Sequence, residues 1–275
     1  MSTVKIHSIA RAVAYPDSEA SLIGLIEELG KSDIPFFVVG RMSNVLAKSK
    51  IYNGVLIKTT KIKNKTKAET HLKLSCGCSL APFIREIADF DLGGFEGLLG
   101  IPGTVGGMVR QNAGAYGYEI SDRFVSAECY VKSTRSIVQM SKKDMHFTYR
   151  DSALTNKDLV LLNATFSFLP KAREDIFSEI SEYARKRKSS QPIEFPSLGC
   201  AFKRCGGIGA GYYIDRAGLK GYSVGGARFS EKHAGFIINT GDATADEYLQ
   251  LLEYAKEKVY STFGINLEEE IEIID

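Results

Sequence analysis

The sequence contains no long apolar run and no strong excess of either charge. Nowhere do about 18 apolar residues follow one another, as a transmembrane helix requires. The opening residues, MSTVKIHSIARAVAYP, lack the apolar core of a secretory signal, so we expect a cytoplasmic protein. The formal net charge is +2, with 25% charged and 44% hydrophobic residues, which disfavours nucleic-acid and membrane-surface partners. We also expect no obligate protein partner.

Cysteines are few, and their spacing is not that of a metal site. The chain has five, at positions 76, 78, 129, 200 and 205, an odd number without zinc-type pairs. We therefore expect free thiols in a reducing compartment and no bound metal. Cys76 and Cys78 lie two apart in the strand-like run LKLSCGCSL, which favours buried or half-buried thiols over ligands. Internal repeats and low-complexity segments are also lacking.

Helical and strand-like segments alternate along the chain. Helices are predicted at 18–32, 80–92, 173–192 and 243–264, and a solvated, Lys-rich hairpin at 61–74. Short β-branched and aromatic runs predict strands at 35–40, 54–59, 125–133, 136–141, 159–170 and 265–275. The pattern predicts a mixed α/β protein.

A glycine-rich stretch, GLLGIPGTVGGMVRQNAGAYG at 97–117, stands out in the middle of the chain. Its glycines alternate with small apolar residues, so it is not a flexible linker. Glycine leaves room at Cβ, and the run from Gly103 to Gly107 can direct several peptide N–H groups at one anion such as a phosphate. The same composition also suits tight, buried turns between strands, and both readings stay open.

A second polar turn follows the predicted strand at 35–40. Ser43 and Asn44 in GRMSN offer hydroxyl, amide and backbone groups where phosphates or ribityl hydroxyls are often held. It is not the dinucleotide GxGxxG pattern, and taken alone this turn is better explained as a plain β-turn.

Eight strings in a fixed order carry a resemblance that no single motif carries. They are SN at 43–44, GIPGTVGG, QNAGAYG, FTYRDS, QPIEFPSLGCAFK, AGLKG, GGARFSEKHAGFIIN and the terminal LEEEI. From about Ala12 to the C-terminus, the chain resembles the family of UDP-N-acetylenolpyruvoylglucosamine reductases, also called UDP-N-acetylmuramate dehydrogenases. The short interval from Arg150 to Cys200 is similar to the subgroup that lacks an extra tyrosine-bearing loop.

The resemblance implies an α+β flavoprotein that uses FAD and NADPH. The fold would be a two-part FAD-binding unit of the vanillyl-alcohol-oxidase (PCMH) type, at 1–62 and 63–170, followed by an α+β substrate domain at 171–275. The C-terminal strand would return to the active site. The implied FAD-binding residues are Gly40, Ser43, Asn44, Val45, Gly103, Thr104, Gly106, Gly107, Asn112, Gly114 and Ala115.

The implied reaction reduces UDP-N-acetylglucosamine enolpyruvate to UDP-N-acetylmuramate, a step in peptidoglycan precursor synthesis. Hydride addition leaves negative charge on the substrate, which needs a fixed cation and then a proton. Arg150 matches the family's arginine and Glu270 its C-terminal glutamate. Cys200 stands where most members have the serine that donates the proton, and a thiol is the stronger acid. The alternative is that Cys200 is a packing thiol in an inactive relative.

Other implied contacts depart from the family pattern in places. Tyr149, Lys220 and His233 match substrate-contacting positions. Arg204 replaces the asparagine of the usual FKNP string, and Met42 replaces a glycine of GxGSN. Two other functions therefore stay open: an FAD oxidoreductase of this fold with another substrate, and a non-catalytic binder of flavin or nucleotide sugar.

Overall fold

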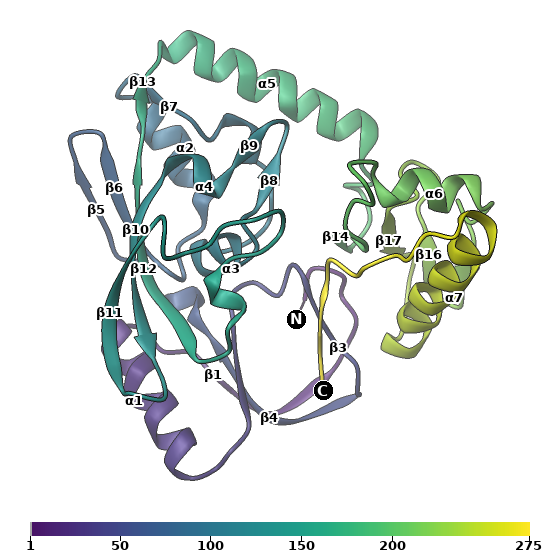
Figure 1. The fold of residues 1–275 in the computed structure, drawn as a ribbon, viewed down its shortest axis with the longest axis horizontal. Coiled ribbons are helices and arrows are strands. Elements are labelled where there is room, and N and C mark those ends of the chain that lie inside the picture. Colours follow the sequence, from purple (N-terminus) through teal and green to yellow (C-terminus); the bar gives the residue numbers. More distant parts are fainter. Residues whose placement is uncertain (1) are drawn as a thin grey trace. The chain divides into compact units, whose positions relative to one another are not determined.

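The computed structural model describes residues 2–275 (Figure 1). The helices are α1 (Glu19–Lys31), α2 (Leu80–Ala88), α3 (Val105–Arg110), α4 (Ile120–Arg123), α5 (Arg173–Ser190), α6 (Ala210–Arg216) and α7 (Ala245–Phe263), with the 3₁₀ turns η1 (Thr59–Lys61), η2 (Glu96–Leu98) and η3 (Ala153–Thr155). The strands are β1 (Ile9–Ala14), β2 (Phe36–Val39), β3 (Val45–Ala47), β4 (Ile51–Lys58), β5 (Lys65–Ala68), β6 (His71–Ser75), β7 (Leu92–Gly93), β8 (Gly114–Ala115), β9 (Tyr118–Glu119), β10 (Phe124–Val131), β11 (Ser136–Ser141), β12 (Leu159–Ser167), β13 (Leu169–Pro170), β14 (Ser197–Cys200), β15 (Ser223–Val224), β16 (Ala227–Phe229), β17 (Phe236–Asn239) and β18 (Glu272–Ile274).

The chain folds into two compact units, each assembled from separate pieces of sequence. Unit 1 contains the segment up to Arg11, residues 42–53 and residues 186–275, and unit 2 contains residues 12–41 and 54–185. The chain therefore enters unit 1 three times. The predicted domains at 1–62, 63–170 and 171–275 stay a prediction, because the units are defined by packing and not by what each part binds.

Unit 2 is built on a five-stranded antiparallel sheet in the order β11-β10-β12-β6-β5. Helix α1 is capped by Ser18, whose side chain forms a reciprocal capping box with that of Ser21. Its buried residues Leu22, Ile26 and Leu29 recur at helical spacing and join the core of the sheet. Figure 1 shows α1, in purple, against the end of the sheet formed by β10 and β11.

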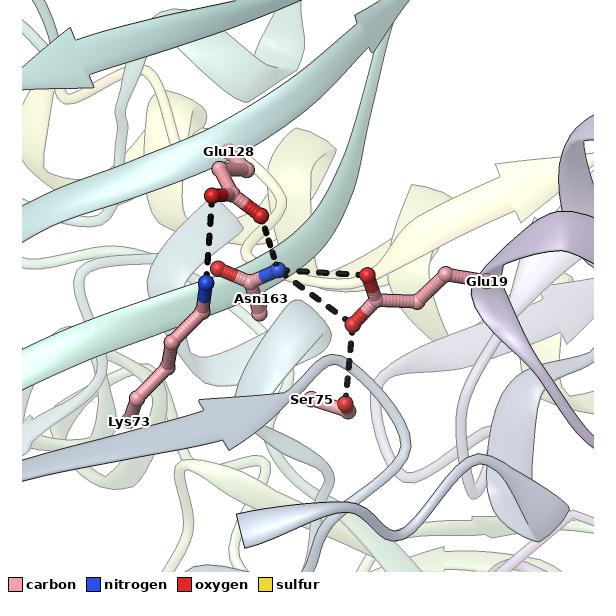
Figure 2. A network of polar contacts seen from close by, with 5 residues as sticks. All are labelled: Glu19, Lys73, Ser75, Glu128 and Asn163. Atoms are coloured by element: carbon pink, nitrogen blue, oxygen red, sulfur yellow. Dashed lines mark hydrogen bonds and ion pairs between the residues drawn. The ribbon is translucent and has the colours of Figure 1, made fainter. Parts of the chain in front are cut away.

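A polar network fixes the start of α1 to this sheet (Figure 2). Asn163 on β12 is 3% exposed, and its amide nitrogen lies 2.6 Å from the Glu128 carboxylate and 3.3 Å from both carboxylate oxygens of Glu19. Ser75 donates to Glu19 at 2.9 Å, and Lys73 pairs with Glu128 at 3.1 Å. The hydrogen bond from Asn163, and then that from Lys73, lowers the pKa of Glu128. The network thus favours the ionised form of Glu128 and places two carboxyl groups around one neutral amide.

Replacing Asn163 by aspartate should lower the free energy of unfolding by about 3 kcal/mol at pH 7, because a third carboxylate would be buried among like charges. The new carboxyl group has a folded pKa above its unfolded value. Its penalty is therefore complete above the folded pKa and disappears as pH falls below the unfolded one. Chemical denaturation at pH 7 and at pH 5 measures the difference, which should shrink at the lower pH.

The exposed Asn53 provides the matched control for this prediction. Asn53→Asp makes the same chemical change on a solvated strand position and should stay within about 0.5 kcal/mol of the parent. A pH-independent loss in the Asn163 variant would contradict the charge explanation.

Unit 1 is built on a four-stranded antiparallel sheet in the order β14-β17-β16-β15, with α6 and α7 packed beside it (Figure 1). Helix α7 begins at a capping box between Thr244 and Glu247 and ends at Gly264, which adopts φ +67°. Its buried Tyr248, Leu251 and Leu252 belong to the core of this unit. Separately, β18 pairs in parallel with β3, so the C-terminal strand is tied to residues 45–47.

The predicted long helices and most predicted strands are confirmed. The sequence did not reveal α3 inside the glycine-rich stretch or α6. The predicted Lys-rich hairpin is confirmed as the antiparallel strands β5 and β6, but it is not wholly solvated, because Leu72 and Leu74 are buried. Cys76, Cys78 and Cys129 are buried, as expected for the first two, and the five cysteines are free thiols. Across residues 2–275, no helix is long and apolar enough to cross a membrane. Within the same range, no group of three or more His, Cys, Asp or Glu residues is placed so that it could hold a metal ion.

Candidate active site

The first half of the glycine-rich stretch forms a loop that leads into α3. Val105 N–H donates to the Cys78 carbonyl and Gly106 N–H to the Cys76 carbonyl, each at 2.8 Å, so these two groups are already used. The candidate donors to a diphosphate are therefore Gly103, Thr104 and Gly107. A Cβ at Gly106 would lie 3.3 Å from the Cys76 carbonyl oxygen, which is a tight contact. We therefore expect that glycine is needed at position 106 to let the loop approach Cys76 closely.

Two loops that the sequence assigned to FAD meet inside unit 2. A Cβ built at Gly40 would collide with the side chain of Thr104, which is 2% exposed. Gly40 therefore permits close approach of the turn after β2 to the glycine-rich loop. Any side chain at Gly40 would fill the space between these two backbone segments. Such a backbone cradle fits an extended anionic cofactor.

The Cys76-Gly77-Cys78 segment supports this loop from behind. A Cβ at Gly77 would collide with the backbone carbonyls of Thr59 and Ile62. Burial raises the pKa of Cys76 to about 12, with a further contribution from Glu19, so this thiol stays protonated. The pair of thiols is therefore part of the core, and its carbonyl groups hold the loop.

The second half of the stretch, QNAGAYG, forms a β-hairpin of β8 and β9. Its turn residues Tyr116 and Gly117 adopt φ +54° and +85°, as a type I′ turn requires. The Asn112 side chain donates to Glu119 at 2.9 Å and to the Thr148 carbonyl at 3.0 Å, and it accepts from Ser121 N–H at 3.0 Å. Asn112 thus holds this hairpin together and ties it to the FTYRDS string.

Arg150 occupies a strained turn beside this hairpin. Thr148 and Asp151 exchange backbone hydrogen bonds around Tyr149 and Arg150, and Arg150 adopts φ +57°, a position that usually takes glycine. Its guanidinium donates to the Gly114 carbonyl at 3.0 Å and lies 5.1 Å from the centre of the Tyr149 ring. Strain of this kind persists where the surroundings impose it, commonly at functional sites.

The turn is fixed to α3, the helix that the glycine-rich loop starts. Ser152 Oγ donates to the Arg110 carbonyl at 2.9 Å, and Arg110 donates to the Leu154 carbonyl at 2.8 Å. Unit 2 therefore brings Arg150 and Tyr149 together with Gly114 and the end of α3.

In unit 1, the structure brings Cys200 and Glu270 into neighbouring backbone positions. Glu270 N–H donates to the Ala201 carbonyl at 2.9 Å, and Asn44 Nδ2 donates to the Glu270 carbonyl at 2.8 Å. Gly199, with φ +83°, lies in a register shift of β14 that re-aims the next side chain, Cys200. Asn44, predicted as an FAD contact, therefore also anchors the segment that carries Glu270.

Sequence reasoning missed Tyr248 as a neighbour of Cys200. Tyr248 is 0% exposed on α7, and burial, followed by the charge of Cys200, raises its pKa. The apolar spacing of α7 marks Tyr248 as a core residue, and no local signal pointed to Cys200.

The remaining substrate candidates also lie in unit 1. Lys220 pairs with Asp215 at 3.2 Å. Burial lowers the pKa of His233, and its Nδ1 accepts the Gly235 N–H at 3.1 Å, so the neutral ring presents Nε2–H as a donor. Arg204 lies in the short irregular segment between the bridge residues Phe202 and Cys205.

Met42 takes the conformation that the family's glycine would take. Its φ is +55°, in the left-handed region, where an L-residue carries about 1–2 kcal/mol of strain. Met42→Gly should raise the free energy of unfolding by about 0.5–1 kcal/mol, because relief of this strain exceeds the entropy cost of glycine. Thermal or urea unfolding of the flavin-free protein measures the change.

Met42→Ala is the control, since it shortens the side chain and keeps the Cβ that causes the strain. It should bring no gain in the free energy of unfolding. An equal gain from alanine and glycine would mean that side-chain packing, not backbone strain, limits this loop.

Comparisons with known proteins agree with these observations. Residues 10–138 match the FAD binding domain family, and residues 191–274 match UDP-N-acetylenolpyruvoylglucosamine reductase, C-terminal domain. The chain is 42% identical to the UDP-N-acetylenolpyruvoylglucosamine reductase of Caldicellulosiruptor saccharolyticus, over 99% of this chain and 88% of that protein. The reductase of Caldanaerobacter subterraneus is 40% identical, over 99% and 90%.

A solved structure extends the likeness to the fold. UDP-N-acetylenolpyruvylglucosamine reductase from Thermus caldophilus has a TM-score of 0.82 and 29% identity, covering 100% of this chain and 96% of the other. The predicted FAD-binding fold is thereby confirmed, as is the resemblance seen in the eight strings. This chain belongs to the family of UDP-N-acetylenolpyruvoylglucosamine reductases.

Proposed function

We propose that this protein reduces UDP-N-acetylglucosamine enolpyruvate to UDP-N-acetylmuramate with electrons from NADPH, in peptidoglycan precursor synthesis. The observation that carries the proposal is the 42% identity to a named reductase over 99% of this chain. The adjacency of Cys200 and Glu270 supports it, because the reaction needs a proton donor next to a group that manages charge.

When bound, FAD would supply the hydride-transfer chemistry between NADPH and the enolpyruvyl group. Gly103, Thr104 and Gly107 would hold its diphosphate through backbone N–H groups, and Gly40 and Gly106 would allow the backbone to approach. The hairpin at Gly114 and Ala115 would lie against the ring system. The remaining proposed contacts are Ser43, Asn44, Val45 and Asn112.

Arg150 would bind the carboxylate of the enolpyruvyl group. Negative charge builds up on this carboxylate and the adjoining carbon as hydride arrives at the terminal carbon. A guanidinium offers two parallel donors to a carboxylate, and its hydrogen bond to Gly114 orients it in advance. Arg150 thus stabilises the charge that develops in the transition state.

Cys200 would then deliver a proton to the substrate carbon that carries the charge. The S–H bond breaks, a C–H bond forms, and the thiolate regains a proton from solvent. Glu270 would act beside it as a protonated or hydrogen-bonded carboxyl group, because a bare carboxylate would repel the enolate. Tyr149, Lys220, His233 and Arg204 are proposed to contact the rest of the nucleotide sugar.

The test is oxidation of NADPH by the purified, FAD-loaded protein with and without the enolpyruvyl nucleotide. We expect the nucleotide to accelerate NADPH consumption and to yield UDP-N-acetylmuramate. A yellow protein whose NADPH oxidation is indifferent to the nucleotide would favour an oxidoreductase of this fold with another substrate. A colourless protein that gains no activity from added FAD would favour a non-catalytic binder.

We also propose that the protein works in the cytoplasm. Its five free thiols suit a reducing compartment, and Cys200 must remain a thiol to act as an acid. The predicted absence of nucleic-acid, membrane and obligate protein partners remains an expectation.

A further inference from the structure

Three consecutive glutamates, Glu268, Glu269 and Glu270, lie at the proposed catalytic position in unit 1. The reaction builds negative charge on a substrate that is itself an anion. Two additional carboxylates next to Glu270 would therefore oppose substrate binding and the transition state unless they were compensated.

The two glutamates that precede Glu270 pair with lysines from different parts of the chain. Lys203 Nζ lies 2.5 Å from Glu268 Oε1, and Lys203 N–H donates to the Glu268 carbonyl at 2.8 Å. Lys256 Nζ, on α7, lies 2.7 Å from Glu269 Oε1. Glu269 in turn forms an isolated bridge with Phe202, two residues after Cys200.

Exposure separates the two pairs. The Glu268 side chain is 73% exposed, so water and salt already screen its charge. The side chains of Lys256 and Glu269 are 31% and 25% exposed, so solvent screens this pair much less. Hydrogen bonds to Glu253 and Glu269 raise the pKa of Lys256, although burial, the largest single influence, acts to lower it. Lys256 thus remains a cation beside Glu269.

We propose that Lys256 is a charge-compensating, positioning residue of the reductase: by neutralising Glu269, it keeps uncompensated negative charge away from Glu270 and the reacting substrate. This inference rests on the proposed function, in which Glu270 contacts the substrate. Lys256 itself acts only through Glu269 and touches neither substrate nor flavin.

The proposal makes a prediction that a mechanical link would not make. If compensation of charge matters, Lys256→Gln is harmful because it exposes the charge of Glu269, whereas Glu269→Gln is harmless because no charge is left to compensate. The double variant should also be harmless. If the pair merely ties α7 to the C-terminal segment, all three variants should be impaired alike.

The experiment measures the rate at which the enolpyruvyl nucleotide oxidises the reduced flavin in the FAD-loaded enzyme. We expect Lys256→Gln to slow this step about tenfold and to weaken nucleotide binding, which is followed by the flavin spectrum of the oxidised enzyme. Lys256→Arg, Glu269→Gln and the double variant should stay within about threefold of the parent. Glu253→Gln is the matched control, because Glu253 also pairs with Lys256 at 2.7 Å but is 64% exposed and lies on α7 itself.

Several outcomes would overturn the proposal. They are a Lys256→Gln enzyme as fast as the parent, a Glu269→Gln enzyme as slow as Lys256→Gln, and a double variant that recovers nothing. Flavin content and the thermal midpoint are measured for every variant, and a defect shared by Lys256→Gln and the double variant would likewise assign Lys256 to packing. The Glu270→Gln variant distinguishes failure of this inference from failure of the proposed function. If Glu270→Gln is slow while Lys256→Gln is as fast as the parent, only the inference about Lys256 fails. If Glu270→Gln is fully active, the proposed role of Glu270 fails as well.

Discussion

Arg150→Ala should slow oxidation of the reduced flavin by the enolpyruvyl nucleotide by about a thousandfold, the largest effect that we expect from a single side chain. The guanidinium is the proposed partner of the substrate carboxylate, where negative charge accumulates. Its removal leaves that charge without a fixed cation. Rapid mixing of the reduced enzyme with nucleotide measures the step directly.

Arg150→Lys should recover only part of this loss, because an ammonium cannot offer the two parallel donors of a guanidinium. Arg135 provides the control for backbone effects. It is an exposed arginine of the same unit with φ +51°, close to the +57° of Arg150. Arg135→Ala should leave both half-reactions unchanged, so a similar loss there would mean that the alanine substitution acts through backbone strain.

Cys200→Ala should produce the second large effect and confine it to one half-reaction. Reduction of the flavin by NADPH should proceed at the parental rate, whereas reoxidation by the nucleotide should slow by about 10²–10⁴-fold, the usual range for loss of a general acid. Only the second half-reaction needs a proton on the substrate carbon. The two halves are measured separately by rapid mixing.

Cys200→Ser should retain activity, since the hydroxyl stands in the same place as in most of the family. Cys205→Ala, five residues on, is the matched thiol control, and it should be neutral in both half-reactions. Equal slowing of both halves by Cys200→Ala, or an inactive serine variant, would reduce Cys200 to a packing thiol.

Local patterns predicted the long helices well, because Leu22, Ile26 and Leu29 repeat with the period of a helix. They failed at α3, whose residues VGGMVR contain two poor helix formers. The short helix forms nonetheless. Its first two N–H groups, at Val105 and Gly106, donate to the backbone carbonyls of Cys78 and Cys76. Those partners lie far back in the chain, outside any local window.

The candidate site was accessible mainly through the family resemblance. Nothing in YRDS alone identifies Arg150 as a functional residue. Only the structure shows that Arg150 adopts φ +57° and that its guanidinium donates to the Gly114 carbonyl. The contact between Asn44 and Glu270 joins residues 226 positions apart. No periodicity or spacing rule connects such positions. For the same reason, the ion pair between Lys256 and Glu269 could not be predicted from the sequence.

The pairing of β18 with β3 also bears on how the protein comes into being in the cell. Glu272 pairs with Val45, and Asn44 donates to the Glu270 carbonyl, so the proposed catalytic segment is the partner of residues made 226 positions earlier in synthesis. Protein units generally fold as they emerge from the ribosome, at about 5–20 residues per second. Residues 12–41 and 54–185 can therefore pack first, while β3 waits for its partner. A ribosome-bound chain that lacks β18 is expected to fold unit 2 and yet to lack catalysis, so activity would wait for the synthesis of β18.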